Sequence, residues 1–135
     1  ALEFYEKALM IREKVLGTEH PSTATSYNNI GGVYYSIGDY NKALEFYEKA
    51  LNIVKNVLGE LHSYTATSYN NIGGVYDSMG DYNKALEYIN KTKDIFEKVL
   101  GEKHPNTKII YGNLAGIYMK IGDEDKAYEY YIKGK

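Results

Sequence analysis

Cysteine and tryptophan are absent from this sequence of 135 residues, and proline occurs only twice. Without cysteine the chain can form no disulfide framework, no zinc site with thiolate ligands and no cysteine nucleophile. An excess of one charge is also lacking, because 16 basic and 18 acidic residues give a net charge of −2. Proteins that bind the phosphate backbone of nucleic acid carry a basic stripe, so we expect no nucleic-acid partner.

Long apolar runs are missing as well. No window of the sequence approaches the roughly 18 consecutive apolar residues of a membrane-spanning helix, and the N-terminus lacks the basic and then apolar pattern of a signal peptide. We therefore expect a soluble, cytoplasmic protein with no membrane partner. Because the sequence starts at Ala1 in the middle of an amphipathic pattern, we also expect it to be an excerpt from a longer protein.

What the sequence does contain is a repeat of 42 residues. The stretch YNNIGGVY begins at Tyr27 and returns letter for letter at Tyr69. Over residues 23–45, 21 of 23 positions are identical to those 42 residues further on. A period of this length is typical of architectures in which one supersecondary unit is stacked several times.

Each unit has the pattern of two α-helices. In the first helix, apolar residues recur at intervals of three and four, as at Tyr27, Ile30 and Tyr34. We expect Gly38 to end this helix in a left-handed conformation and Asp39 to cap the next one. No segment of useful length alternates with period two, so strands are not expected.

These helix pairs predict an all-α fold of about seven helices, arranged as a right-handed superhelical array of antiparallel pairs (an α-solenoid). We expect one domain over residues 1–135 with four parts: residues 1–16 as the second helix of a partial repeat, 21–58 and 63–100 as repeats, and 105–135 as a repeat with a shortened last helix. A helix pair cannot bury its apolar face alone. Neighbouring pairs must therefore stack, which creates one concave and one convex surface.

Small, aliphatic and aromatic residues occupy fixed offsets in the unit. They are Tyr27, Ile30, Gly31, Tyr34, Ala43, Tyr47 and Ala50. This pattern resembles the tetratricopeptide repeat signature, and the 42-residue period is similar to the variant found in kinesin light chains. The resemblance covers essentially the whole chain and implies a scaffold that binds other proteins.

Asparagines on the first helices are the main candidates for ligand binding. The resemblance implies that Asn29, Asn71 and Asn113 contact the backbone of a bound peptide, as asparagine commonly does at this position in the family. Asn28 and Asn70 are further candidates, because an amide side chain can pair with both a carbonyl and an N–H group. The alternative, which stays open, is that the asparagines bond to neighbouring helices and hold adjacent repeats in register.

Residues three or four apart share one face of a helix, and this spacing adds five candidates to the peptide-binding set. They are Thr25, Thr67, Tyr35, Asp77 and Lys120. Tyr35 and Asp77 break an otherwise near-perfect repeat, which selection on a binding surface or drift at an exposed site explains equally well. Lys120 is the one cation on these strips, so we expect recognition of peptide backbone with apolar or aromatic pockets and no paired-cation clamp for a terminal carboxylate.

Two neighbouring glycines in each first helix have different expected roles. Gly31 belongs with Ala43 to the seam where the paired helices approach most closely, so a larger side chain would force them apart. Gly32, Gly74 and Gly116 lie one residue further on and are turned toward the concave surface. There they either leave room for a ligand backbone or merely permit close packing.

Catalytic and metal-binding patterns are not found. His20, His62 and His104 recur in the turns, but equivalent positions in stacked units are at least a helix width apart, about 8 to 10 Å, which is too far for one metal ion. We interpret these histidines as packing the start of a helix. Ser26 and Ser68 have no histidine and acid placed to activate them. We therefore expect no metal, no cofactor, no catalytic residue and no enzymatic activity.

The sequence thus predicts a protein-interaction module that holds a peptide or partner segment in its concave groove. Two alternatives stay open. The array could be the sensor or regulatory segment of a larger signalling or effector enzyme, or it could assemble end to end as a homo-oligomer, because both ends carry unfinished apolar seams.

Overall fold

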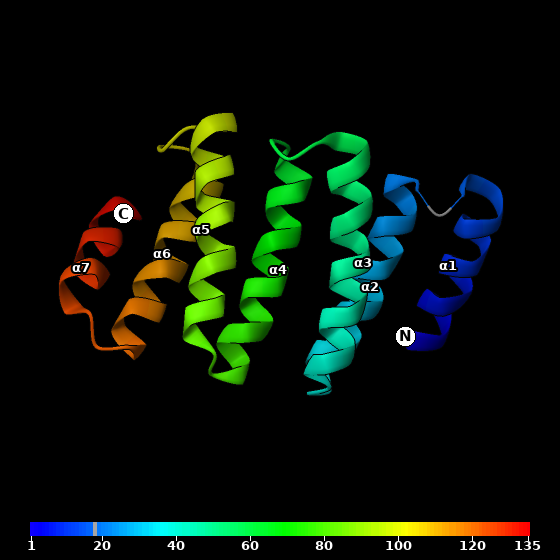
Figure 1. Cartoon of the computed structure of the whole chain (residues 1–135), viewed down its shortest axis with the longest axis horizontal. Helices are drawn as coiled ribbons and strands as arrows, with labels where there is room; N and C mark the ends of the chain where they lie inside the picture. Colours follow the sequence, from blue (N-terminus) through cyan, green and yellow to red (C-terminus); the bar gives the residue numbers. More distant parts are fainter. Residues whose placement is uncertain (18) are drawn as a thin grey trace. The chain divides into compact units, whose positions relative to one another are not determined.

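A computed structural model describes residues 1–17 and 19–135, and within this part of the chain all regular structure is helical. Figure 1 shows the helices in chain order. They are α1 (Leu2–Leu16), α2 (Pro21–Ser36), α3 (Tyr40–Leu58), α4 (Ser63–Met79), α5 (Tyr82–Val99), α6 (Pro105–Lys120) and α7 (Glu124–Lys133). The all-α class expected from the sequence is confirmed.

The chain divides into two compact units, one over Ala1–Glu60 and the other over Leu61–Lys135. In the first unit α2 packs against α3, and α1 packs against α2. The core between α2 and α3 is built from Ala24, Ala50, Ile53 and Val54, with Tyr27 and Leu58 at its edge. Small side chains on α2 and β-branched ones on α3 let the two helices approach closely.

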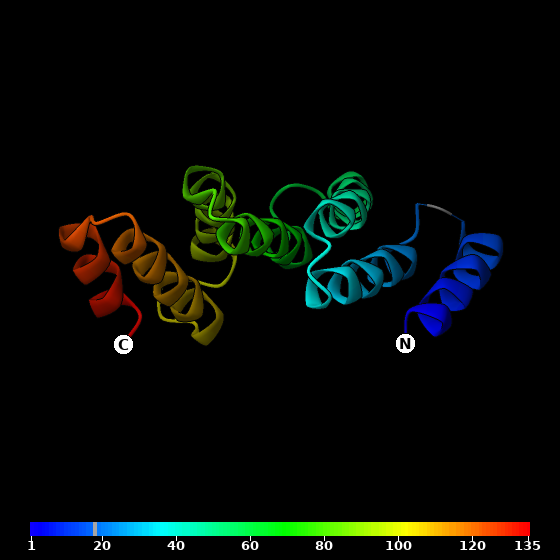
Figure 2. The ribbon, with the colours of Figure 1, turned by 90° about the horizontal axis from the view of Figure 1, so that it is seen from below.

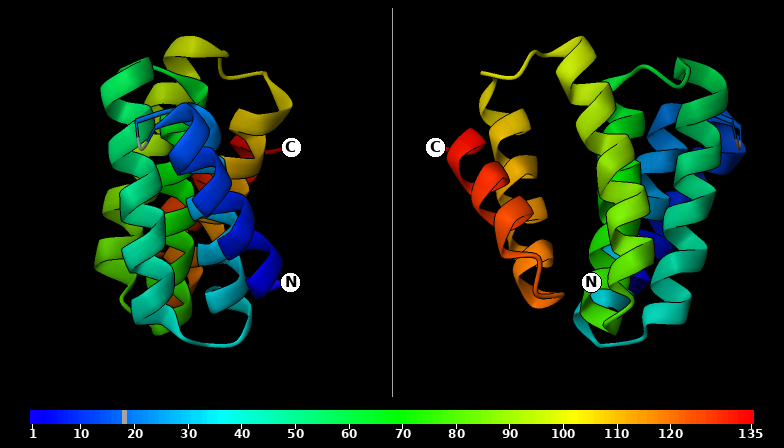
Figure 3. Two further views of the ribbon diagram at one scale, coloured as in Figure 1. Left: turned by 90° about the vertical axis from the view of Figure 1, so that its right-hand side faces the viewer. Right: turned by 60° about the vertical axis from the view of Figure 1, so that its left-hand side comes forward.

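In the second unit α4 packs against α5, α5 against α6, and α6 against α7. Figures 2 and 3 show α6 between α5 and α7 from different directions. Ile72, Val75, Leu114 and Ile117 are almost completely buried in this unit. Burial of each of these apolar side chains stabilises the folded state by about 1.5 to 3 kcal/mol, because it removes apolar surface from water.

Polar side chains fix where the helices begin. Asp39, Asp81 and Asp123 each accept a hydrogen bond from the backbone N–H three residues later, at 3.1 to 3.2 Å. The starts of α2, α4 and α6 use histidine, whose Nδ1 accepts from the backbone N–H two residues later at 3.0 Å. These interactions satisfy N–H groups that have no partner within the helix. Gly38 has φ of +85°, as predicted for the end of a helix.

Gly31 and Gly73 lie where the paired helices approach most closely, as predicted for Gly31. A Cβ atom on Gly31 would lie 2.8 Å from the ring of Tyr47. A Cβ atom on Gly73 would lie 2.6 Å from Cγ1 of Ile89 and 3.3 Å from the carbonyl oxygen of Ala85. Since both distances to side-chain carbon are below van der Waals contact, glycine is required for the observed packing.

Each helix pair also contains a stack of three aromatic rings with ring centroids 5.6 to 6.1 Å apart. The three stacks are Tyr27, Phe46 and Tyr34; Tyr69, Tyr88 and Tyr76; and Tyr111, Tyr130 and Tyr118. Lysines flank the rings in every pair, for example Lys42 at 5.4 Å from the centre of the Tyr34 ring. Aromatic stacking and cation–π contacts therefore hold the paired helices together outside the aliphatic core.

Within residues 1–17 and 19–135, no helix combines the length and the apolar character needed to cross a bilayer.

Candidate functional site

The candidate residues of the first unit all lie on α2. Asn29 and Thr25 are exposed, and the Thr25 hydroxyl donates to the carbonyl oxygen of Pro21 at 3.2 Å. Tyr35 is 37% exposed and its ring is 5.7 Å from that of Tyr40. Asn28 is half-buried, and its Oδ1 atom is buried without a hydrogen-bond partner among the described residues. Buried acceptors are normally paired, so this oxygen is an exception to that rule.

In the second unit, candidate residues border a cavity of about 220 Å³ that is formed by α4, α5 and α6. Its lining consists of Thr67, Asn70, Phe96, Asn106, Ile109 and Ile110. Three of these side chains are polar and three are apolar. This mixture suits a peptide, because amide and hydroxyl groups can bond its backbone while the apolar groups contact one of its side chains.

Asp77 and Lys120 are brought together although they are 43 residues apart in the sequence. The Lys120 Nζ atom donates to Asp77 Oδ1 at 2.9 Å, which joins α4 to α6. The same ammonium group lies 5.7 Å from the centre of the Tyr82 ring. Since the charge of Lys120 is already balanced by a carboxylate, this lysine is poorly suited to bind the terminal carboxylate of a ligand.

Asn71 is half-buried on α4 and Asn113 is exposed on α6, and neither lines this cavity. Of the candidate asparagines in the second unit, only Asn70 therefore lines the cavity. Phe96 and Asn106 border the cavity but were not among the candidate residues. The 42-residue repeat alone could not identify them, because a lining residue is defined by contacts between different repeats.

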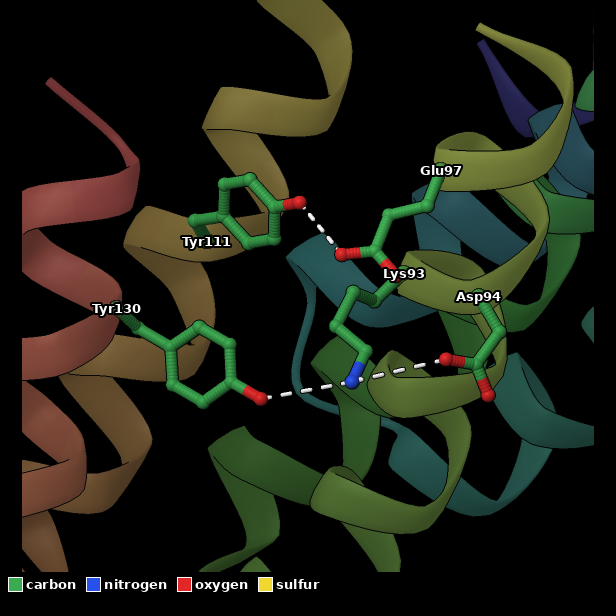
Figure 4. A network of polar contacts seen from close by, with 5 residues as sticks. All are labelled: Lys93, Asp94, Glu97, Tyr111 and Tyr130. Atoms are coloured by element: carbon green, nitrogen blue, oxygen red, sulfur yellow. Dashed lines mark hydrogen bonds and ion pairs between the residues drawn. The ribbon is translucent and has the colours of Figure 1, made fainter. Parts of the chain in front are cut away.

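A polar network connects α5 to α6 and α7 (Figure 4). The Tyr111 hydroxyl donates to Glu97 Oε2 at 2.5 Å. Lys93 Nζ donates to the Tyr130 hydroxyl at 3.4 Å and is 3.6 Å from Asp94 Oδ1. Burial, together with the bond to Glu97, raises the pKa of Tyr111 well above its ordinary value. Burial lowers the pKa of Lys93, but Tyr130, Asp94 and Glu97 outweigh it and raise that pKa overall.

The first unit contains the counterpart of one of these bonds. The Tyr27 hydroxyl donates to Glu13 Oε1 at 2.9 Å and so joins α2 to α1. Burial, followed by the bond and charge of Glu13, raises the pKa of Tyr27 to about 12. Both tyrosines therefore stay neutral and act as donors throughout the physiological pH range. We conclude that these polar groups hold successive helix pairs together.

A larger cavity of about 590 Å³ lies on α6 and α7. It is lined by Gly112, Ala115, Gly116, Met119, Glu124, Ala127, Tyr128 and Tyr131. Tyr128 and Tyr131 are 67% and 53% exposed, which is unusual for side chains of this size. These tyrosines were not predicted as site residues from the sequence. A signal was present, because Tyr128 occupies the position of Leu44 and Leu86 in the other repeats.

In the part of the chain that the structure describes, residues 1–17 and 19–135, no three histidine or acidic side chains are grouped so that they could hold a metal ion. The three histidines instead cap the starts of α2, α4 and α6. Their spacing by 42 residues is thus explained by the repeated need for a helix cap.

Comparison with known proteins identifies the family of this chain. The model of the tetratricopeptide repeat family matches residues 1–56, 33–98 and 64–134, which together cover almost the whole chain. The chain belongs to the tetratricopeptide repeat family. A search of curated proteins found no significant match.

Solved structures with the same fold include BtubC (BKLC) from P. vanneervenii, with 27% sequence identity and a TM-score of 0.91. A protein of Podosopora anserina described as a kinesin light chain with nearly identical TPR-like repeats has 26% identity and a TM-score of 0.85. A Rap protein complexed with competence and sporulation factor has 26% identity and a TM-score of 0.86. Each match covers 98% of this chain, which spans 53%, 63% and 36% of the three proteins, respectively.

The repeats and these neighbours define the class of protein: a protein–protein interaction scaffold with kinesin light chain-like tetratricopeptide repeats. Its fold is that of a module that binds other proteins.

Proposed function

We propose that the chain binds an extended peptide segment of a partner protein along the first helices of its repeats. The observation that carries this proposal is the cavity of the second unit, where Thr67, Asn70 and Asn106 lie beside Phe96, Ile109 and Ile110. Amide and hydroxyl groups bond peptide backbone without selecting its side chains, and the apolar groups supply the affinity. A volume of about 220 Å³ is suited to a single side chain of the peptide.

The asparagines of the first unit support the same proposal. Asn28 carries a buried oxygen without a partner among the described residues, and Asn29 is exposed. Gly74 and Gly116 have no atom within 4 Å of the place where a Cβ would be. These glycines leave the helix backbone accessible, so a peptide main chain can approach it closely.

The test compares two double variants in a binding assay with a displayed library of random peptides. We expect Asn28→Ala with Asn70→Ala, and Asn29→Ala with Asn71→Ala, each to weaken the peptides selected on the unaltered array by about tenfold, the usual cost of removing hydrogen bonds at an interface. Circular dichroism and thermal melting should stay nearly unchanged. If a double variant unfolds, its asparagines hold the repeats in register, and if both bind peptide normally, the proposed site is wrong.

A second candidate is a sensor or regulatory segment within a larger signalling protein. The neighbour that favours it is the Rap protein solved in complex with competence and sporulation factor, of which this chain spans 36%. In this case ligand binding to the repeats would control a separate effector domain. The sequence of the regions flanking the repeats would distinguish this candidate from a simple scaffold.

We further propose that the binding module is non-catalytic, requires no cofactor and works in the cytoplasm. The balanced charge of the chain, 16 basic against 18 acidic residues, supports protein partners over nucleic acid.

A further inference from the structure

The lining of the cavity between α4, α5 and α6 is not reproduced by the 42-residue repeat. Two of its six residues, Thr67 and Asn70, have identical counterparts one repeat earlier, Thr25 and Asn28. The other four differ from the residues at the same positions of the preceding repeat. They are Phe96, Asn106, Ile109 and Ile110, in place of Val54, Tyr64, Thr67 and Ser68. This combination of side chains therefore occurs at only one place in the sequence.

Three of the four differing residues make the cavity apolar. Phe96 and Ile110 are 6% and 2% exposed, so they lie on its inner side, whereas Ile109 is 60% exposed. None of the six lining residues carries a charge. A charged side chain is costly to bury without a partner. The cavity therefore favours an uncharged, apolar side chain.

Polar groups of the same cavity can hold a peptide backbone beside that side chain. The Thr67 hydroxyl donates to the carbonyl oxygen of Ser63 at 3.0 Å, and its oxygen keeps lone pairs that can accept a bond from a peptide N–H. Asn70 on α4 and Asn106 on α6 each carry an amide with a donor and an acceptor. Backbone and side chain of one peptide residue can thus be bound at the same place.

An ion pair further along α4 and α6 helps to keep the walls of the cavity in place. The Lys120 Nζ atom donates to Asp77 Oδ1 at 2.9 Å. Asp77 follows Asn70 by seven residues, which is about 10 Å along a helix. The residues one repeat earlier are Tyr35 and Ser78, which cannot form an ion pair. Walls that are in place before binding reduce the entropy that a ligand must lose to be held there.

Repeated groups that bind peptide backbone cannot by themselves fix where a peptide is placed. Asn28 and Asn29 on α2 recur as Asn70 and Asn71 on α4. Amides that bond only to backbone accept any peptide sequence, so a peptide would bind either set with a similar free energy. Specificity is a difference between binding free energies. It therefore requires a feature that only one of the two sets possesses.

We propose that the cavity of α4, α5 and α6 fixes the position of a bound peptide on the repeats by accepting one uncharged, apolar side chain. Asn106 and Ile109 are the specificity-determining residues, because they are the exposed members of the four that differ from the repeat. The inference rests on the proposed peptide-binding function. It adds which part of the peptide is selected and where on the chain it binds.

The test uses peptides selected from the displayed random library on the unaltered chain. We expect these peptides to share one apolar residue at a fixed position. Replacement of this residue by alanine should weaken binding by about tenfold or more, because buried apolar surface is lost. Asn106→Ser with Ile109→Thr, the cavity variant, gives α6 the residues that α2 has at these positions, Ser22 and Thr25. It should also bind the selected peptides about tenfold more weakly.

Combining the two changes shows whether the shared residue and the cavity contact each other. On the cavity variant, alanine replacement in the peptide should weaken binding by about threefold or less, since two changes at one contact are not additive. Lys108→Ala is the matched control. Lys108 adjoins Ile109 and also differs from the repeat, which has Ala66 at this position, but it does not line the cavity. This control should bind the selected peptides normally.

A crosslinking experiment tests the placement directly. An apolar diazirine residue takes the place of the shared apolar residue in the peptide, and mass spectrometry locates the crosslinks after illumination. On the unaltered chain we expect crosslinks to the segments that contain Phe96 and Ile109, and none to α2. On the cavity variant, crosslinks to α2 should appear as well, because the two asparagine sets then differ less in affinity.

The proposal is overturned if the selected peptides share no apolar position, if the cavity variant binds them normally, or if crosslinks spread equally over α2 and α4 in the unaltered chain. Because Asn106 and Ile109 are exposed, the variants should keep the circular dichroism spectrum of the unaltered chain. Alanine replacement in the peptide gives a result that does not depend on the folding of any variant.

Failure of this inference can be told apart from failure of the proposed function. Weaker binding by the asparagine double variants, together with normal binding by the cavity variant, would count against this inference alone. Failure to select any peptide, or normal binding by both asparagine double variants, would count against the proposed function, and this inference would fall with it.

Discussion

Several residues of this chain are poor helix formers that are nevertheless needed for packing between helices. Two glycines and two asparagines in YNNIGGVY make a poor helix, since glycine costs about 1 kcal/mol relative to alanine. The structure explains Gly31 and Gly73, which face Tyr47 and Ile89 at distances that exclude a Cβ. A Cβ atom on Gly74, one residue after Gly73, would point to another side of the helix and into open space. Adjacent glycines therefore have different physical reasons to be present.

This difference predicts opposite effects of the same substitution. Gly73→Ala should lower the free energy of unfolding by about 1 to 3 kcal/mol, because Ile89 and the Ala85 carbonyl leave no room for the added methyl group. Gly74→Ala should raise it by up to about 1 kcal/mol through helix propensity. Urea unfolding followed by circular dichroism measures both changes. Equal effects at the two positions would contradict the assignment of Gly73 to the helix seam.

At the scale of the helices, each repeat folds into the same pair of helices because it carries its own helix-capping residues. Aspartate caps α3, α5 and α7, and histidine caps α2, α4 and α6. The aspartate cap was predicted from the sequence at Asp39. The histidines were expected only to pack the helix start, and their acceptor role became clear from the 3.0 Å distance between Nδ1 and the backbone nitrogen.

The cap on α6 can be tested at His104. His104→Ala should lower the free energy of unfolding by about 0.5 to 2 kcal/mol, the usual cost of removing a side-chain cap. His104→Asn should recover most of this loss, because asparagine accepts the same bond from Asn106 N–H. Chemical denaturation at neutral pH provides the measurement. If asparagine is as destabilising as alanine, packing of the imidazole ring matters more than the cap.

Across the whole molecule, burial is unevenly distributed among the helices. None of the residues of α1 is buried, whereas five or more are buried in each of α2 to α6. In a linear array each helix is stabilised by its neighbours, so a helix with little buried surface opens independently of the rest. The first helix should therefore be the least stable part of the first unit.

Native-state hydrogen exchange tests this expected difference in local stability between α1 and the rest of the first unit. Backbone amides of α1 should exchange at least about a hundredfold faster than those in the middle of α3, since α1 has no buried residue and its local opening exposes less apolar surface than the opening of α3. Amides of α3 are the internal control within the same unit. Equal protection of α1 and α3 would contradict the expected difference.

The sequence by itself determined the helical class, the 42-residue unit, the aspartate cap at Asp39 and the glycine seam at Gly31. These features depend on residues close together in the chain or on a spacing that repeats, and both can be read directly. Only the tertiary structure decided that Lys120 pairs with Asp77, that Asn70 borders a cavity with Phe96 and Asn106, and that Tyr128 and Tyr131 lie exposed on α7. Near-identical repeats have near-identical local sequence patterns. Equivalent helix faces therefore differ mainly in the neighbouring helix that packs against them.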